Sequence, residues 1–216
     1  MDNLNKETLN ITEIFYSLQG EARDVGIPTI FIRLTGCPLR CNYCDTTYAF
    51  KGNNPLTIEQ VLAKVSQYNT EYICVTGGEP LAQKNCLKLL DALAKDNYKI
   101  SLETSGSIDI SPVNSCVSIV MDLKTPSSTE CHQNRYENIA LLGEKDQLKF
   151  VIADQDDFNW SCDILKNNPT SAGVLFSPVY ELLKPAKLAD WILEKQLNVR
   201  MQVQLHKILW GEEQGK

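Results

Sequence analysis

Three of the eight cysteines, Cys37, Cys41 and Cys44, stand in one short run with the spacing C-x3-C-x2-C. Cysteine thiolates bind zinc and iron, and this spacing is too rare to be ordinary cysteine usage. A structural zinc normally has four protein ligands, and the nearest candidates for a fourth, His132 and His206, lie far away in the sequence. A four-iron cluster held by three cysteines would leave one iron free to bind another molecule. The spacing therefore predicts an iron-sulfur site with an open position, and a structural zinc is the alternative.

We expect the three cysteines to lie on a loop. Their positions, i, i+4 and i+7, would also suit one face of a helix. Gly36, Pro38, Asn42 and Asp45 surround them, however, and these residue types favour turns. The other five cysteines are scattered, and we expect them to pack as small apolar residues, as Cys74 would within Tyr-Ile-Cys-Val-Thr.

A second motif, Thr76-Gly77-Gly78-Glu79-Pro80, follows the next apolar run. Glycines there allow the backbone to approach a ligand more closely than residues with a Cβ could. The cysteine run and this turn each come directly after a predicted strand, over residues 29–34 and 72–76. Barrel folds place their sites at the carboxyl ends of their strands, so both motifs are expected at the end that carries the site.

Strands and helices alternate along the chain. Amphipathic stretches predict helices over residues 57–68, 82–95 and 185–196. Alternation of this kind is typical of a parallel sheet wrapped by its crossover connections. A full eight-fold barrel takes about 250 residues, so we predict an α/β fold with an incomplete βα barrel of about six parallel strands in a single domain, 1–216. Short apolar or β-branched runs predict the strands over residues 29–34, 72–76, 99–103, 117–123, 147–152, 173–177 and 199–204.

Composition and charge narrow the class of protein. The chain is 43% hydrophobic and 22% charged, which is ordinary for a globular protein. Its net charge of -6 argues against nucleic acid as a partner. No apolar run approaches the length of about 18 residues that predicts a membrane span, and residues 1–7 lack the features of an export signal. We therefore expect a cytoplasmic protein that binds no membrane and whose cysteines form no structural disulfides.

The two motifs together resemble the signature of the radical S-adenosylmethionine superfamily. In that superfamily C-x3-C-x2-C follows the first barrel strand, and the Gly77-Gly78 turn matches its second motif. The resemblance implies a 4Fe-4S cluster whose open iron chelates the amine and carboxylate of S-adenosylmethionine. An electron from the cluster then cleaves this cofactor to a 5'-deoxyadenosyl radical.

Further motifs are similar to those of the 7-carboxy-7-deazaguanine synthase family. The resemblance implies that the substrate is 6-carboxy-5,6,7,8-tetrahydropterin, whose ring contracts with loss of ammonia to 7-carboxy-7-deazaguanine in queuosine and deazapurine biosynthesis. It also implies Mg2+, a homodimer and an electron donor such as flavodoxin. The motifs are Ser17-Leu18-Gln19-Gly20-Glu21, Gly26-Ile27-Pro28-Thr29, Phe31-Ile32-Arg33-Leu34, Cys44-Asp45-Thr46, Glu103-Thr104-Ser105-Gly106 and Asp122-Leu123-Lys124.

The same resemblance implies a role for individual residues. The three cysteines Cys37, Cys41 and Cys44 would ligate the iron. The residues implied to bind S-adenosylmethionine are Tyr43, Cys44, Asp45, Gly78, Asp122, Leu123 and Lys124. Those implied to bind the substrate are Leu18, Gln19, Gly20, Arg33 and Thr76. Thr46 would give its hydroxyl to Mg2+, and an Asp-Thr turn or a helix cap is the alternative for this residue.

For Arg33 and Glu103 the sequence leaves two interpretations open, one structural and one in ligand binding. Arg33 lies within an apolar strand, and an arginine is almost never buried unpaired. Its guanidinium suits the carboxylate of the substrate, but a structural ion pair with Glu21 or Glu103 would explain it equally well. Glu103 either binds cofactor or substrate, or caps the turn over residues 104–106.

Three other positions stay open. Ala22 stands where the family usually has a glycine, so the backbone freedom of that loop is in question. His206 and Lys207 alternate on a strand-like segment and could line the pocket, although a solvated edge strand is the more frequent explanation for such a pattern.

Two other classes of protein share part of this pattern. An activase that installs a glycyl radical on a partner protein has the cysteine motif and a small barrel. It does not explain Gln19-Gly20-Glu21 with Arg33, nor Asp45-Thr46. A non-enzymatic module in which the cysteines hold structural zinc is the third hypothesis.

Overall fold

One sheet organises the molecule. The computed structural model describes residues 7–216, so the expected absence of an export signal concerns a segment that lies mostly outside this range. The strands in the described part are β1 (Thr8–Leu18), β2 (Pro28–Leu34), β3 (Pro55–Thr57), β4 (Tyr72–Gly77), β5 (Lys99–Thr104), β6 (Ser118–Asp122), β7 (Gln147–Ile152), β8 (Gly173–Pro178) and β9 (Arg200–Met201). They form an open sheet in the order β3-β1-β2-β4-β5-β6-β7-β8-β9.

Most of this sheet is parallel, as the sequence predicts. From β2 through β4 to β9 each neighbouring pair runs parallel. Within the described residues, the antiparallel pairs are β1 with β2 and β1 with β3, at one edge of the sheet. The predicted incomplete βα barrel is therefore confirmed, with β1 and β3 as an addition that the alternation of strands and helices did not predict.

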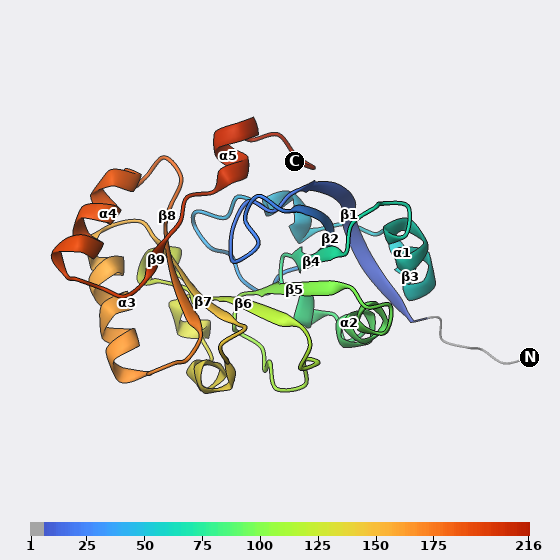
Figure 1. Cartoon of the computed structure of the whole chain (residues 1–216), viewed down its shortest axis with the longest axis horizontal. Coiled ribbons are helices and arrows are strands. Elements are labelled where there is room, and N and C mark those ends of the chain that lie inside the picture. The colour runs from blue at the N-terminus through green and yellow to red at the C-terminus, as the bar shows by residue number, and fades with distance from the viewer. Residues whose placement is uncertain (1–6) are drawn as a thin grey trace, which may run out of the picture.

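Helices cover the ends of the sheet. In Figure 1, α1 and α2 lie beside one end, α3 and α4 beside the other, and α5 lies near the C-terminus. The α-helices of the described residues are α1 (Ile58–Val65), α2 (Cys86–Lys95), α3 (Gln155–Asn167), α4 (Pro185–Glu194) and α5 (Leu205–Trp210). Short 3-10 helices are η1 (Thr47–Phe50), η2 (Pro80–Ala82), η3 (Pro126–Ser128), η4 (Cys131–Gln133) and η5 (Tyr136–Leu141).

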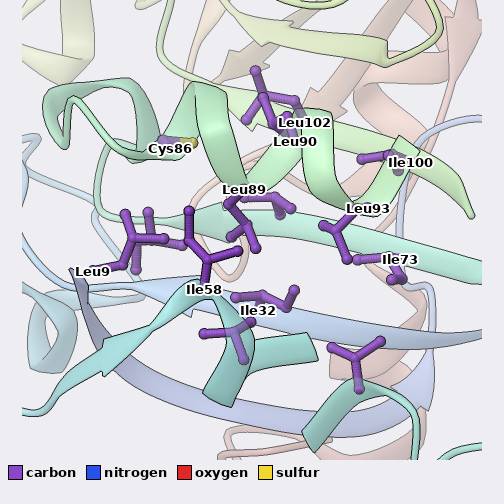
Figure 2. Close-up of a cluster of buried hydrophobic side chains, with 14 of the residues drawn as sticks. Leu9, Ile32, Ile58, Ile73, Cys86, Leu89, Leu90, Leu93, Ile100 and Leu102 are labelled. Atoms are coloured by element: carbon purple, nitrogen blue, oxygen red, sulfur yellow. The ribbon is translucent and has the colours of Figure 1, made fainter. Parts of the chain in front are cut away.

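The start of α1 shows why the predicted helices form. Thr57 and Gln60 make a reciprocal capping box, which satisfies two free N–H groups at the start of the helix. The apolar stripe of the helix then packs on the sheet, with Val61 and Val65 fully buried. Figure 2 shows the same core, where side chains of α2 such as Leu93 lie beside strand residues such as Ile73. Each fully buried aliphatic side chain contributes about 1.5–3 kcal/mol.

The last predicted strand is the main error. The prediction over residues 199–204 holds only for Arg200–Met201. Beyond it the Gln202 side chain bonds to both backbone groups of Ala22, through Ala22 N to Oε1 at 2.6 Å and Nε2 to Ala22 O at 3.0 Å. No strand continues beyond Met201 in the described residues, and α5 begins at Leu205. His206 and Lys207 therefore lie on a helix, and the interpretation as a solvated edge strand is wrong.

The alanine at position 22 occupies a left-handed backbone conformation, with φ +65°. That conformation costs an alanine roughly 1 kcal/mol more than a glycine, which explains why glycine suits this position. The Ala22 side chain is buried against Val120 and Leu175, and burying one methyl group contributes about 0.8 kcal/mol. Packing therefore offsets most of the backbone strain, and the loop keeps its path with alanine.

Candidate active site

A cavity of about 590 Å3 opens at the carboxyl ends of the parallel strands. Its wall combines the cysteine loop after β2, the ends of β4 to β8, the loop after β1 and part of α5. Every residue for which the sequence predicts a role lines this cavity except Leu123. The Leu123 side chain is fully buried in a separate hydrophobic cluster that includes Phe150 of β7 and Phe158 of α3.

The cysteine loop follows β2 directly and contains no helix, which confirms the predicted loop. The three thiols are half-buried and line the cavity. Burial raises the pKa of Cys37 and Cys44, and raises the pKa of Cys41 to about 11. At neutral pH the thiols are therefore protonated, and metal binding must release their protons. Cys74 and Cys86 are fully buried as expected, but Cys116 is exposed and Cys131 and Cys162 are only half-buried, so the expectation that all five scattered cysteines lie buried in the core is wrong for these three.

The cysteine loop packs directly on the glycine turn after β4. Glu79 N donates to Gly36 O at 2.9 Å. A Cβ at Gly78 would lie 2.3 Å from Gly36 O and 2.6 Å from Cys37 Cβ, distances that real Cβ atoms do not reach. Glycine is therefore required at position 78 for a steric reason inside the protein, in addition to the predicted contact with a cofactor.

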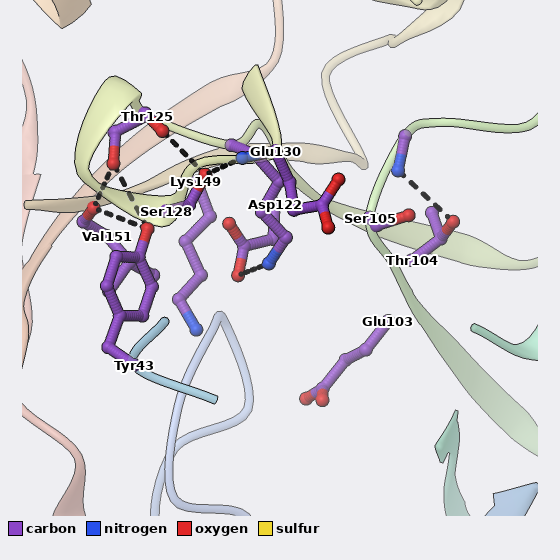
Figure 3. Close-up of polar contacts among 12 residues, drawn as sticks. Tyr43, Glu103, Thr104, Ser105, Asp122, Thr125, Ser128, Glu130, Lys149 and Val151 are labelled. Atoms are coloured by element: carbon purple, nitrogen blue, oxygen red, sulfur yellow. Dashed lines mark hydrogen bonds and ion pairs between the residues drawn. The ribbon is translucent and has the colours of Figure 1, made fainter. Parts of the chain in front are cut away.

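The wall beside the cysteines carries an acceptor without a partner. Asp122 Oδ2 pairs with Lys124 Nζ at 3.0 Å, whereas Asp122 Oδ1 is buried and has no hydrogen-bond partner. Burial alone would lower the pKa of Lys124, but Asp122 raises it well above its ordinary value. Figure 3 shows Asp122 near Tyr43, whose hydroxyl lies 3.0 Å from Thr125 Oγ1. A free buried acceptor beside three thiols fits a polar ligand such as the ribose of a nucleoside cofactor.

Thr46 forms neither a helix cap nor an Asp-Thr turn of the ordinary kind, the two structural alternatives for this residue. It stands at the start of η1, yet its side chain makes no cap hydrogen bond. Instead Thr46 Oγ1 donates to Asp45 Oδ1 at 2.8 Å, and Gln204 Nε2 donates to Asp45 Oδ2 at 3.3 Å. Hydroxyl and carboxylate oxygens thus lie together on the cavity wall, and such oxygens suit Mg2+.

The ion-pair partner of Arg33 is Glu13, and neither Glu21 nor Glu103. Arg33 Nε donates to Glu13 Oε1 at 2.7 Å. Burial alone would lower the pKa of Arg33, but the hydrogen bond and charge of Glu13 raise it above its ordinary value. The predicted partners were wrong because β1, which carries Glu13, was not predicted. Glu21 pairs with Lys149 instead.

Glu103 does not cap the turn that follows it. Its Oε2 accepts from Thr76 Oγ1 at 2.9 Å, and its Oε1 accepts from Gln19 Nε2 at 3.5 Å, so it joins two predicted substrate residues. The turn is held by Glu79, which is fully buried and accepts from Thr104 Oγ1 and from Ser105 N and Oγ. The Glu103 side chain faces the cavity, as Figure 3 shows.

Sequence reasoning missed other polar residues of the wall. Lys149 lies on β7 inside an apolar run, and its ion pair with Glu21 joins β7 to the loop after β1. Arg33 was identified because it is a single charged residue within an apolar strand. Lys149 shows the same pattern, so the sequence could also have identified it. Burial would lower the pKa of Lys149, but Glu21 raises it above its ordinary value. His206 and Lys207 of α5 also line the cavity, which confirms the interpretation from the sequence that they could line the pocket.

Within the described residues 7–216, no helix is both long and apolar enough to cross a membrane. In the same range no three His, Cys, Asp or Glu side chains, those of the cysteine loop included, are grouped closely enough to hold a single metal ion. A four-iron cluster differs from a single ion because each cysteine binds a different iron.

The parallel sheet and the cysteine loop at its carboxyl end define a radical S-adenosylmethionine protein, and residues 31–139 match the radical SAM superfamily. The chain is 38% identical over 208 residues to 7-carboxy-7-deazaguanine synthase of Chlorobaculum tepidum, covering 94% of each. It is 40% identical over 205 residues to the enzyme of that name from Methanospirillum hungatei, covering 93% of this chain and 85% of the relative. The chain belongs to the 7-carboxy-7-deazaguanine synthase family.

Solved structures agree on the fold. The crystal structure of QueE from Escherichia coli matches with a TM-score of 0.78 and 22% identity, covering 95% of this chain and 99% of that one. Streptococcus suis SuiB matches with a TM-score of 0.58 and 14% identity, covering 78% of this chain and 46% of that one. Family membership confirms the resemblance seen in the sequence and implies a 4Fe-4S cluster and S-adenosylmethionine as cofactors.

Proposed function

We propose that this chain is a 7-carboxy-7-deazaguanine synthase of queuosine biosynthesis, which converts 6-carboxy-5,6,7,8-tetrahydropterin into 7-carboxy-7-deazaguanine with loss of ammonia. In addition to family membership, one structural observation supports the proposal. The cysteine loop and a separate set of polar residues, including Gln19 and Arg33, line the same cavity. A cavity of about 590 Å3 has the size of sites that enclose small molecules.

Two sets of residues, which share Cys44, would bind the cluster and S-adenosylmethionine. The thiolates of Cys37, Cys41 and Cys44 would hold the cluster. When bound, the cluster and S-adenosylmethionine supply the reductive cleavage that starts radical chemistry on the substrate. The wall beside the cysteines would bind S-adenosylmethionine through Tyr43, Cys44, Asp45, Gly78, Asp122, Leu123 and Lys124. Since the Leu123 side chain points into the core, only its backbone is available for this role.

The opposite side of the cavity would position the pterin. The guanidinium of Arg33 suits its carboxylate, and the amide of Gln19 can both donate to and accept from the ring. Leu18, Gly20 and Thr76 would complete the contact. The protein would orient substrate and cofactor toward each other. Orientation alone can lower the activation barrier of a reaction by several kcal/mol. A homodimer, an electron donor such as flavodoxin and a cytoplasmic location belong to the same proposal.

Anaerobic reconstitution with iron and sulfide, followed by turnover, tests the proposal. We expect a protein with iron and sulfide bound that converts the carboxytetrahydropterin into a product with the mass of 7-carboxy-7-deazaguanine. A glycyl-radical activase would leave that substrate unchanged. Colourless protein with stoichiometric zinc would exclude radical chemistry altogether.

The Thr46→Val variant tests the proposed role of Mg2+. Valine keeps the shape of threonine but removes the hydroxyl that would ligate the ion. We expect an unchanged iron content and a requirement for roughly tenfold more Mg2+, because one hydrogen bond or ligand contact to a charged group contributes about 1.5–3 kcal/mol. The measurement is the rate as a function of Mg2+ concentration. Thr47→Val, at an exposed position outside the cavity wall, is the control, and an identical Mg2+ response in both variants would place the ion elsewhere.

A further inference from the structure

A bulge in β1 brings Glu13 opposite Arg33. The antiparallel register pairs Ile11 with Leu34 and then Glu13 with Arg33, so β1 advances two residues where β2 advances one. Without this extra residue, Thr12 would face Arg33. β-Bulges are frequent beside functional sites because they re-aim a side chain, and this one places a carboxylate beside the guanidinium.

The Glu13 carboxylate holds Arg33 through a single oxygen. Glu13 Oε1 accepts from Arg33 Nε at 2.7 Å and from the Tyr48 hydroxyl at 2.8 Å. The guanidinium carbon also lies 5.8 Å from the ring centroids of Phe15 and of Tyr48. Two aromatic rings and one carboxylate therefore fix the plane and the direction of the guanidinium.

Glu13 itself is not part of the cavity wall, whereas Arg33, Phe15 and Tyr48 are. Its influence on a bound molecule must therefore pass through the wall residues that it holds, Arg33 and Tyr48, and of these only Arg33 carries a charge that matches a carboxylate. Since Arg33 Nε is engaged by Glu13, the two Nη groups at the end of the guanidinium are the donors left for a ligand. Paired N–H groups of this kind bind a carboxylate in a bidentate manner.

We propose that Glu13 is a positioning residue that aims the Nη groups of Arg33 at the carboxylate of the substrate, and so favours carboxylated pterins over uncharged ones. This inference rests on the proposed function. For the orientation of Arg33, the length of the Glu13 side chain is more important than its negative charge. The Glu13 oxygen must extend as far as Arg33 Nε, because the direction of the guanidinium decides whether both Nη groups contact the ligand.

Two conservative variants separate reach from charge. Glu13→Gln keeps an oxygen at the same distance and removes the charge, whereas Glu13→Asp keeps the charge and withdraws the oxygen by one methylene. We expect Glu13→Asp to lower kcat roughly tenfold, as small misplacements in an active site do, and Glu13→Gln to retain kcat within about threefold of the wild type. Glu71→Gln, in an exposed ion pair with Lys99, is the matched control.

A binding measurement gives a readout other than turnover. The fluorescence of 6-carboxypterin and of unsubstituted pterin is titrated with the cluster-loaded protein and its variants. We expect the preference for 6-carboxypterin to fall roughly tenfold in Glu13→Asp and to persist in Glu13→Gln. Iron content should be equal in all variants.

Two results would overturn the inference while the wild type still converts its substrate. One is a Glu13→Asp variant with wild-type kcat and wild-type preference for 6-carboxypterin. The other is a Glu13→Gln variant that loses both as severely as Glu13→Asp, since charge rather than reach would then decide. A wild-type enzyme that is fully loaded with cluster and leaves the carboxytetrahydropterin unchanged would contradict the proposed function instead.

Discussion

The Cys41→Ala variant should contain no stable cluster and should not turn over substrate. Cys41 lines the cavity in the middle of the loop, and a cluster held by only three thiolates, as we propose, would have no spare ligand. Because the loss is of a ligand rather than of packing, we expect the variant to fold with the same secondary structure. The measurement is iron and sulfide per chain after anaerobic reconstitution, together with product formation.

The control for this variant is Cys116→Ala, which removes an exposed thiol outside the cavity wall. It should bind as much iron as the wild type and retain turnover. A Cys41→Ala protein that turned over substrate without iron would contradict the assignment of the cysteine loop.

The second large effect is on stability, and it concerns Glu79. Its fully buried carboxylate accepts hydrogen bonds from Leu81 N, Thr104 Oγ1, Ser105 N and Ser105 Oγ, which join the end of β4 to the turn after β5. In Glu79→Ala these donors stay buried without an acceptor, at about 1–3 kcal/mol for each one left unsatisfied. Allowing for partial relaxation, we expect the free energy of unfolding to fall by about 3–5 kcal/mol.

Thermal unfolding of the anaerobic, cluster-loaded protein measures this effect. A loss of that size corresponds to a Tm roughly 10 °C lower for a chain of this length. Glu71→Ala removes a carboxylate from an exposed ion pair, and it should shift Tm by no more than about 2 °C. Equal shifts in the two variants would mean that the Glu79 hydrogen bonds contribute little to stability.

Local patterns predicted the parts of the site that depend on short spacing. The cysteine loop and the Gly77-Gly78 turn each follow a strand closely, so their placement at one end of the sheet needed only the parallel arrangement. Glu79 was within a recognised motif, but its hydrogen bonds to Ser105 depend on the tertiary structure.

The segments that escaped prediction lie outside the repeating βα pattern. In β1 the bulge between Ile11 and Glu13 breaks the two-residue alternation by which a half-buried strand is recognised. Helix α5 has only six residues, which is too short for a clear helical period. The pair of Glu21 and Lys149 joins positions 128 residues apart, and no local signal specifies such a partner.

The cavity is built from two parts of the chain that meet only in the folded protein. The cysteine loop rests on the turn after β4, and the two motifs pack so closely that no room is left for a Cβ at Gly78. Arg33 and the loop after β1 form the facing wall, with Glu13 behind Arg33, and strand pairing joins this wall to the two motifs. Substitutions on the facing wall can therefore change which molecule is accepted while the radical-generating machinery stays intact, which makes β1 the natural place to redirect this scaffold toward new substrates.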